Sequence, residues 1–151
     1  MASSKRRLII ENVVSALETI TITNGYLTNL GNNVINLSTS PMVENDLSGA
    51  AVKEGAITFE PGALGLADGH FAEMSVTIDT YTKGANAKDD IDNNIQDIVA
   101  ALGVDRKRGG NAQNTELEQI EINSDSANLT TVGASIDFNI QFTNFRFDLT
   151  R

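Results

Sequence analysis

"ASIDFNIQFTNFRFDL", residues 134–149, has the most regular alternation of apolar and polar residues in the chain. Its first part alternates, because the even positions from 136 to 142 carry Ile or Phe and the odd positions between them are polar. This period of two predicts a long β-strand with one buried face. Beyond this part the apolar residues fall on odd positions: Phe145, Phe147 and Leu149. The change of face predicts a bulge or bend at Thr143-Asn144, where the strand turns its apolar side chains toward another surface.

Other strands are indicated earlier in the chain. Residues 117–122 alternate less cleanly, and the turn sequence "NSDSAN" joins them to the long strand, so these two strands should form an antiparallel hairpin. Residues 71–81 alternate again and predict a half-buried strand. A short strand is predicted over residues 56–59, where the turn sequence Glu60-Pro61-Gly62 closes it.

Two segments have the period of an amphipathic helix. The first spans residues 4–19 and can be capped by Ser3 or Ser4. Its apolar face consists of Ile10, Val13, Val14, Leu17 and Ile20. The second is "NAKDDIDNNIQDIVAALG", residues 86–103, in which Gly103 stands where a C-terminal cap is expected. Its buried stripe consists of Ile91, Ile95, Ile98 and Leu102, with Val99 beside it.

The segment between the first helix and the first clear strand is less regular. Asn24-Gly25 is a hairpin signal, but the run before it is very short and competes with the helix. A turn at Gly25 followed by an extended stretch through residues 26–30, with a continuation over residues 34–37, is therefore favoured. Residues 38–54 read as a long loop. The order of elements predicts a single α+β domain over residues 1–151, with an antiparallel four- to five-stranded sheet and both helices packed on one face.

Composition limits the class of protein. The chain has 151 residues, is 40% hydrophobic, and carries a net charge of −9. An acidic chain repels nucleic acid as a whole, because DNA affinity depends on cations that neutralise phosphates. Cysteine is absent, which excludes disulfides and thiolate chemistry. No run approaches the ~20 apolar residues of a membrane span, and no secretion signal is recognised, so we expect a protein made in a cytoplasm.

Candidate catalytic and metal-binding patterns are weak. His70 is the only histidine, which excludes a histidine-rich metal site, and no Gly-x-Ser-x-Gly elbow accompanies it. Asp90, Asp92 and Asn94 match the first half of a calcium-binding loop, but Ile95 replaces the glycine of the sharp turn. The sequence therefore predicts no enzyme, no metal and no cofactor.

Two basic clusters oppose the acidic balance. Lys5, Arg6 and Arg7 lie in the first turn of the predicted helix, where cations oppose the helix dipole, so local stability does not explain them. Arg106, Lys107 and Arg108 lie in a loop that continues with two glycines. Each cluster is a candidate contact with an acidic partner or a phosphate. The alternative for the loop is an ordinary solvated segment.

The chain as a whole resembles the tail terminator, or tail completion, proteins of long-tailed bacteriophages. The opening "LIIENVVSALETITITNGYLTNLGNNV" is similar to their first helix, which is followed by Gly-Tyr and a strand. "HFAEMSVTIDTYTKG", the helix "DDIDNNIQDIVAAL" and the final strand "GASIDFNIQFTNFRF" match the order of elements that follows. The segments 38–54 and 60–70 are not matched.

This resemblance implies a structural virion protein, made in the host cytoplasm, that forms a ring, expected to be a homohexamer. Such a ring caps the tail tube protein, ends tube polymerisation and offers the surface that joins the head-tail connector or adaptor proteins. Genomic DNA passes through its channel, and an acidic lining would keep DNA from sticking. The resemblance implies no catalytic site and no membrane.

The face change of the final strand fits such a ring. Phe145, Phe147 and Leu149 are the candidate subunit interface, since a neighbouring subunit can cover them. The alternative is that this segment curls round the protein's own helices.

Two other functions compete with the tail terminator. A head-side neck adaptor, or head-completion protein, is also a small ring former that meets the connector. A small β-rich binding module, for carbohydrate as an example, would need clustered exposed aromatic residues, whereas aromatic residues make up 5% of the chain and tryptophan is absent.

Overall fold

The computed structural model describes residues 3–37, 49–61, 69–125 and 128–145. Over these residues the helical elements are α1 (Lys5–Glu18), the short 3-10 turns η1 (Ile22–Asn24) and η2 (Leu30–Asn32), and α2 (Ala87–Val104). The strands are β1 (Val34–Asn36), β2 (Ala50–Pro61), β3 (Gly69–Lys83), β4 (Asn114–Asp125) and β5 (Asn128–Phe145). The predicted α+β class is confirmed.

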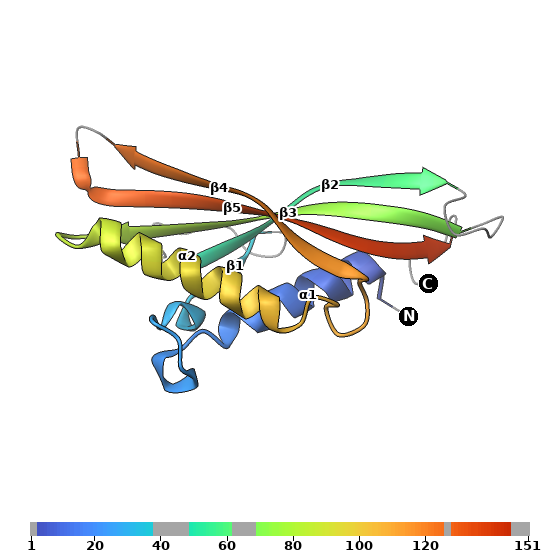
Figure 1. Cartoon of the computed structure of the whole chain (residues 1–151), viewed down its shortest axis with the longest axis horizontal. Helices are drawn as coiled ribbons and strands as arrows, with labels where there is room; N and C mark the ends of the chain where they lie inside the picture. Colours follow the sequence, from blue (N-terminus) through green and yellow to red (C-terminus); the bar gives the residue numbers. More distant parts are fainter. Residues whose placement is uncertain (1–2, 38–48, 62–68, 126–127, 146–151) are drawn as a thin grey trace.

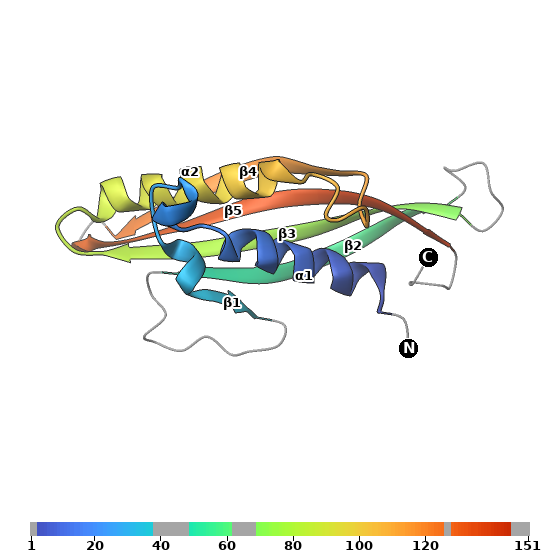
Figure 2. The same cartoon turned by 90° about the horizontal axis from the view of Figure 1, so that it is seen from below.

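The strands form a single sheet in the order β1-β2-β3-β5-β4. β1 and β2 are parallel, and the other neighbours are antiparallel, including the predicted β4–β5 hairpin. The sheet is strongly twisted, and Figures 1 and 2 show α1 and α2 on the same side of it. We call this side the helix face and the opposite side the open face.

The core lies between the helix face and the two helices. In β3 and β5 the even-numbered side chains point toward the helices. They lie opposite one another across the two strands, as Ile78 does with Ile136 and Met74 with Ile140. The predicted stripes of α1 and α2 complete the same apolar cluster. The alternation read from the sequence therefore has its expected cause, which is that one face of each strand is buried against the helices.

α1 begins and ends as the sequence indicates. Ser4 is the N-cap, and its Oγ accepts a hydrogen bond from the Arg7 amide at 3.3 Å. Ile9, Ile10, Val13 and Leu17 are its buried residues. The cap satisfies one of the free amides of the first turn.

α2 extends beyond its predicted end. Gly103 is inside the helix, and Asp105 is the C-cap, so the prediction that Gly103 ends the helix is wrong. The physical reason is that the last carbonyls of the helix have a side-chain partner. The guanidinium of Arg108 donates to the carbonyls of Leu102 and Asp105, and a glycine cap is therefore not required.

The segment between α1 and β2 differs most from expectation. The residues around Gly25 form a turn as predicted, and the φ angle of Gly25 is 92°. Residues 26–30, predicted to be extended, do not form a strand. Residues 50–54, predicted to lie in a long loop, are the first part of β2. β3 pairs with all five of these residues and β1 pairs with residues 50–52, and this pairing makes a strand of a segment without a clear period. Residues 38–48 lie outside the described residues.

A buried carboxylate holds the connection after η1 against α2. Asp97 is 3% exposed and accepts hydrogen bonds from the amides of Leu27 and Thr28 at 3.1 and 2.8 Å. The Thr28 hydroxyl donates to the same carboxylate at 2.7 Å. Three donors from one irregular segment therefore converge on one helical residue, which fixes the segment without a regular strand.

The predicted bulge at Thr143-Asn144 is not present. β5 pairs with β3 in one unbroken register to its end, where His70 lies opposite Asn144 and Gly69 opposite Phe145. The even position 144 is still a buried one, at 4% exposed, although it carries a polar residue, Asn144. The strand itself continues to alternate.

Candidate assembly surface

β4 is an edge strand whose side chains are largely uncovered. Among the strands that the structure describes it pairs with β5 alone, and every side chain from Glu116 to Asn123 is exposed. Leu117, Ile120 and Ile122 are 45%, 42% and 56% exposed. An edge strand of 12 residues with uncovered apolar side chains is a site at which another chain can add.

A β-bulge gathers these apolar side chains on one face. The register between β4 and β5 shifts between Leu117 and Gln119. Leu117 therefore lies opposite Phe138 while Ile120 lies opposite Ile136, both of which belong to the helix face. This extra residue explains why the sequence of β4 alternates less cleanly, since Leu117 is odd and the later apolar residues are even.

The open face of β4 is acidic. Glu116 lies opposite Asn139, and Glu121 lies opposite Ser135, which places both on the open face. Glu118 Oε1 accepts a hydrogen bond from Asn139 Nδ2 at 3.2 Å. Because "NTELEQIEINSD" contains no lysine or arginine, this edge has no cation of its own.

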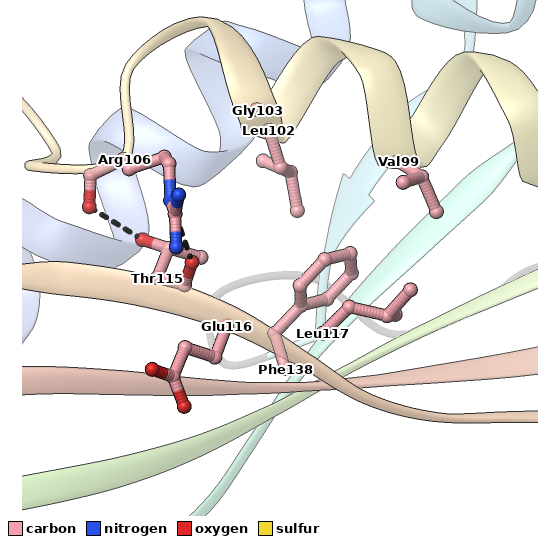
Figure 3. Close-up of a pocket in the computed structure, with 8 residues that line it drawn as sticks. All are labelled: Val99, Leu102, Gly103, Arg106, Thr115, Glu116, Leu117 and Phe138. Atoms are coloured by element: carbon pink, nitrogen blue, oxygen red, sulfur yellow. Dashed lines mark hydrogen bonds between the residues drawn. The ribbon is translucent and has the colours of Figure 1, made fainter.

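A groove runs beside β4, between the strand and the C-terminal half of α2. It encloses about 600 Å³, and Figure 3 shows the Phe138 ring pointing toward α2 across it. Thr115 Oγ1 donates to the Arg106 carbonyl at 2.8 Å at one end of the groove. The apolar lining consists of Val99, Leu102, Leu117 and Phe138. The groove continues the uncovered apolar surface of β4 toward the helix.

The opposite edge of the sheet is formed by β2. β1 covers only residues 50–52 of this strand, and the described residues show no neighbour on the outer side of residues 53–60. A register shift between Glu54 and Ile57 accommodates Gly55, whose Cβ, if present, would lie 2.9 Å from the Ser75 Cβ. Beyond the shift, Phe59 lies opposite the buried Ala72 and is on the helix face, where it is exposed.

The basic cluster of α1 lies at this β2 edge. Arg6 forms an ion pair with Glu54 of β2. Lys5 Nζ donates to the Thr143 carbonyl at 2.5 Å, and Arg7 pairs with Glu11 at 2.8 Å along the helix. These contacts explain how three cations are held in a first turn whose dipole disfavours them. Arg7 remains exposed and accessible to a partner.

The second basic cluster is divided between surface and interior. Arg106 and Lys107 are exposed, but Arg108 is fully buried and its guanidinium caps α2. The predicted partner contact is therefore corrected for Arg108, because its side chain faces the interior of its own subunit. Arg108 has φ at 51° and is followed by Gly109 and Gly110 at 69° and 87°, a run of left-handed backbone that needs the two glycines.

Charge in this loop is balanced locally. Burial lowers the pKa of Arg108, and the nearby Asp105 carboxylate opposes that effect. The Gly109 amide donates to Asp105 Oδ2 at 2.7 Å and lowers the pKa of Asp105. The loop is thus an internally bonded cap of α2. Lys107 and Arg106 are its exposed cations, and Arg106 Nε also donates to the Thr115 carbonyl of β4 at 3.4 Å.

Arg108→Met should lower the free energy of unfolding by about 1–3 kcal/mol, because two carbonyls at the end of α2 lose their donor. Lys107→Met, one residue away and exposed, should change it by less than about 0.5 kcal/mol. Urea unfolding monitored by circular dichroism measures both. Equal effects at the two positions would show that the buried cap does not stabilise α2.

The remaining candidate residues lie at the end of β5 or beyond it. Phe145 is the last residue of β5. Phe147 and Leu149 lie outside the described residues, so their predicted interface role stays a prediction. His70 packs against Phe59, with ring centroids 6.0 Å apart in an edge-to-face arrangement.

A metal-binding cluster is not found in the described part of the chain. Over those residues, no three or more His, Cys, Asp or Glu side chains are grouped so that they could hold a metal ion. Asp90, Asp92 and Asn94 belong to α2, as the mismatch with a calcium loop predicted. Neither described helix has the length and apolar character that crossing a membrane requires.

Comparison with models of known protein families gives no match for this chain. Comparison with curated proteins gives no significant match either.

Sequence reasoning missed the apolar edge of β4. The predicted interface was placed at the end of β5, whereas the structure exposes apolar side chains on β4. The imperfect alternation of "LEQIEI" was the available signal, because one inserted residue between apolar positions is the pattern of a bulged strand.

Proposed function

We propose that this protein is a structural virion protein of the tail terminator kind, which assembles into a ring on the end of a phage tail tube. In this role the ring ends tube polymerisation and joins the connector. The similarity of element order to that family, noted from the sequence, supports the specific role.

The observation that carries the proposal is the β4 edge. A long edge strand with three uncovered apolar side chains is unusual for a monomer, because it templates uncontrolled association. A closed ring removes this hazard, since each copy covers the edge of the next. A surface of this kind favours a protein that works by assembly over one that works by binding a small molecule.

The open face of the sheet supports passage of DNA through such a ring. Most residues that β3 and β5 present on this face are polar, and four strands carry acidic side chains there. These acids are Glu60, Glu73, Asp79, Glu116, Glu118, Glu121 and Asp137, and the cations of the same face are Lys53 and Lys83. A net negative lining repels phosphate, so DNA slides without adhering.

The double substitution Ile120→Ser/Ile122→Ser should weaken self-association about 10- to 100-fold, because it removes apolar surface that the ring would bury. Its unfolding free energy should change by less than about 1 kcal/mol, since both side chains are exposed in the subunit. Sedimentation velocity and thermal unfolding measure the two effects. Ile22→Ser, at an exposed apolar residue of η1, is the matched control and should leave association unchanged.

Particles assembled without this protein test the biological role. Negative-stain images should show overlong tails, because nothing ends tube growth. Headless tails of normal length beside tailless heads would place the protein at the head side, as a neck adaptor. Normal infectious particles would reject both roles.

A further inference from the structure

A ring could form through several pairs of surfaces on neighbouring copies. The two edges of the sheet differ in charge, and this difference indicates which surfaces are in contact. Among the described residues, the edges without a neighbouring strand are residues 116–123 of β4 and residues 53–60 of β2, which have the same length and lie on opposite sides of the sheet. We call them the acidic edge and the basic edge. The basic edge includes the first turn of α1, which Arg6 joins to Glu54.

Pairing of two acidic edges is electrostatically unfavourable. A two-fold contact between β4 strands would bring Glu116, Glu118 and Glu121 of one copy against the same residues of the other. Like charges directly opposite in a β-ladder are destabilising, and β4 supplies no cation to separate them. A symmetric β4–β4 dimer is therefore disfavoured.

Pairing of an acidic edge with a basic edge is complementary in charge. The basic edge carries the cations Arg6, Arg7 and Lys53, with Lys5 beside them donating to the Thr143 carbonyl of β5, and its acids are Glu11, Glu54 and Glu60. It is therefore positive by about one charge, whereas residues 116–123 of β4 carry three acids and no cation. Lys53 lies on the open face, opposite Thr77, which is the face that the β4 acids share. Its contact with Asp79 is long, at 3.7 Å, and its side chain is largely exposed, so it remains accessible to a partner.

The same pairing is also complementary in apolar surface. On the helix face the acidic edge presents Leu117, Ile120 and Ile122. On the helix face of the basic edge, Ile57 lies opposite Met74 and Phe59 lies opposite Ala72. Joining the edges side by side thus places apolar residues against apolar residues on the helix face and brings Lys53 toward the β4 acids on the open face. The cations of α1 lie on the helix-face side of the same contact.

From these observations we infer that copies of this chain associate head to tail, with the acidic edge of β4 on one copy against the basic edge of β2 and α1 on the next. This inference rests on the proposed ring and adds its contact surfaces. A head-to-tail contact uses two different surfaces, so it closes into a ring when the rotation between copies allows.

Charge-reversed variants test the inference by mixing. Glu118→Lys/Glu121→Lys makes both edges basic, and Arg7→Glu/Lys53→Glu makes both edges acidic. Each variant alone should associate at least about 100-fold more weakly than wild type, because like charges then meet at every contact. An equimolar mixture should recover assemblies of wild-type size, with the two variants alternating. Native mass spectrometry reports both the size and the composition, and circular dichroism checks that each variant is folded.

Other results would overturn the inference. If either variant assembled alone as wild type does, or if the mixture failed to recover assembly, the contact would lie elsewhere. A wild-type chain that stayed monomeric up to about 1 mM would show that the edges do not bind each other. The proposed function is judged separately, by tail length in particles that lack the protein. If particles without the protein had overlong tails but the charge variants assembled as wild type does, the proposed function would stand and the proposed contact surfaces would be wrong.

Discussion

Phe138→Ala lowers the free energy of unfolding by about 3–5 kcal/mol, the largest loss we expect from a single truncation here. Phe138 is 3% exposed, and its ring fills the space between β5 and the C-terminal half of α2 (Figure 3). Alanine at this position would enlarge the existing groove into the core. Because α2 is held by the sheet around it, the site has little freedom to collapse, and the cavity penalty adds to the lost burial.

Leu117→Ala is the matched control for this truncation. Leu117 lies opposite Phe138 and lines the same groove, but it is 45% exposed. Leu117→Ala should lower the free energy of unfolding of the subunit by less than about 1 kcal/mol. Guanidinium unfolding of both variants gives the comparison. Similar losses at the two positions would mean that β4 packs against α2 more closely than the groove indicates.

Asp97→Ala should lower the free energy of unfolding by about 3 kcal/mol, since three donors that converge on this carboxylate would be left without their acceptor. The donors belong to residues 27–28, which lie outside any helix or strand. Loss of the carboxylate should also release this segment from α2. Hydrogen exchange at the Leu27 and Thr28 amides should therefore become faster.

Two variants separate the role of this carboxylate from a general effect of charge on α2. Asp97→Asn keeps one acceptor oxygen and should recover part of the stability. Asp92→Ala removes an exposed acid of the same helix, whose carboxylate accepts only from Gln96 at 2.9 Å among the described contacts, and should cost less than about 0.5 kcal/mol. Protection of the Leu27 amide that survives Asp97→Ala would contradict the proposed anchoring.

Together these sites show a subunit with a well-packed core below a strand whose apolar side chains are exposed. Phe138 and Asp97 fix α2 and its connections to the sheet, while β4 extends past them with uncovered side chains. A firm scaffold lowers the entropy lost when an edge strand is ordered in a contact. This arrangement is consistent with the proposed ring.

The amphipathic elements were readable from the sequence because one physical cause dominates each of them. The stripe of α2 and the alternation of β3 and β5 all arise from burial against a single core. Ser4 was readable as a cap because its hydroxyl satisfies a free amide within its own turn. Each of these signals is local, so no knowledge of distant segments was required.

The errors arose where the partner is distant in sequence. Residues 50–54 show no strong period, and they form a strand because β3 pairs with all of them and β1 with residues 50–52. Arg108 looked like a surface cation, and only the end of α2 makes it a buried cap. The sequence around Asn144 predicted a bulge or bend, whereas Asn144 is a polar residue at a buried position of a regular strand.

Periodicity and composition were enough to predict the α+β class, the two helices, the long central strands and the acidic character of the chain. The folded arrangement was needed to show which strand lies at the edge, which cations remain at the surface and where apolar side chains stay uncovered. The physical reason is that strand order and side-chain exposure depend on hydrogen bonds and packing between segments far apart in the chain, whereas a sequence pattern records only which face of each segment is apolar.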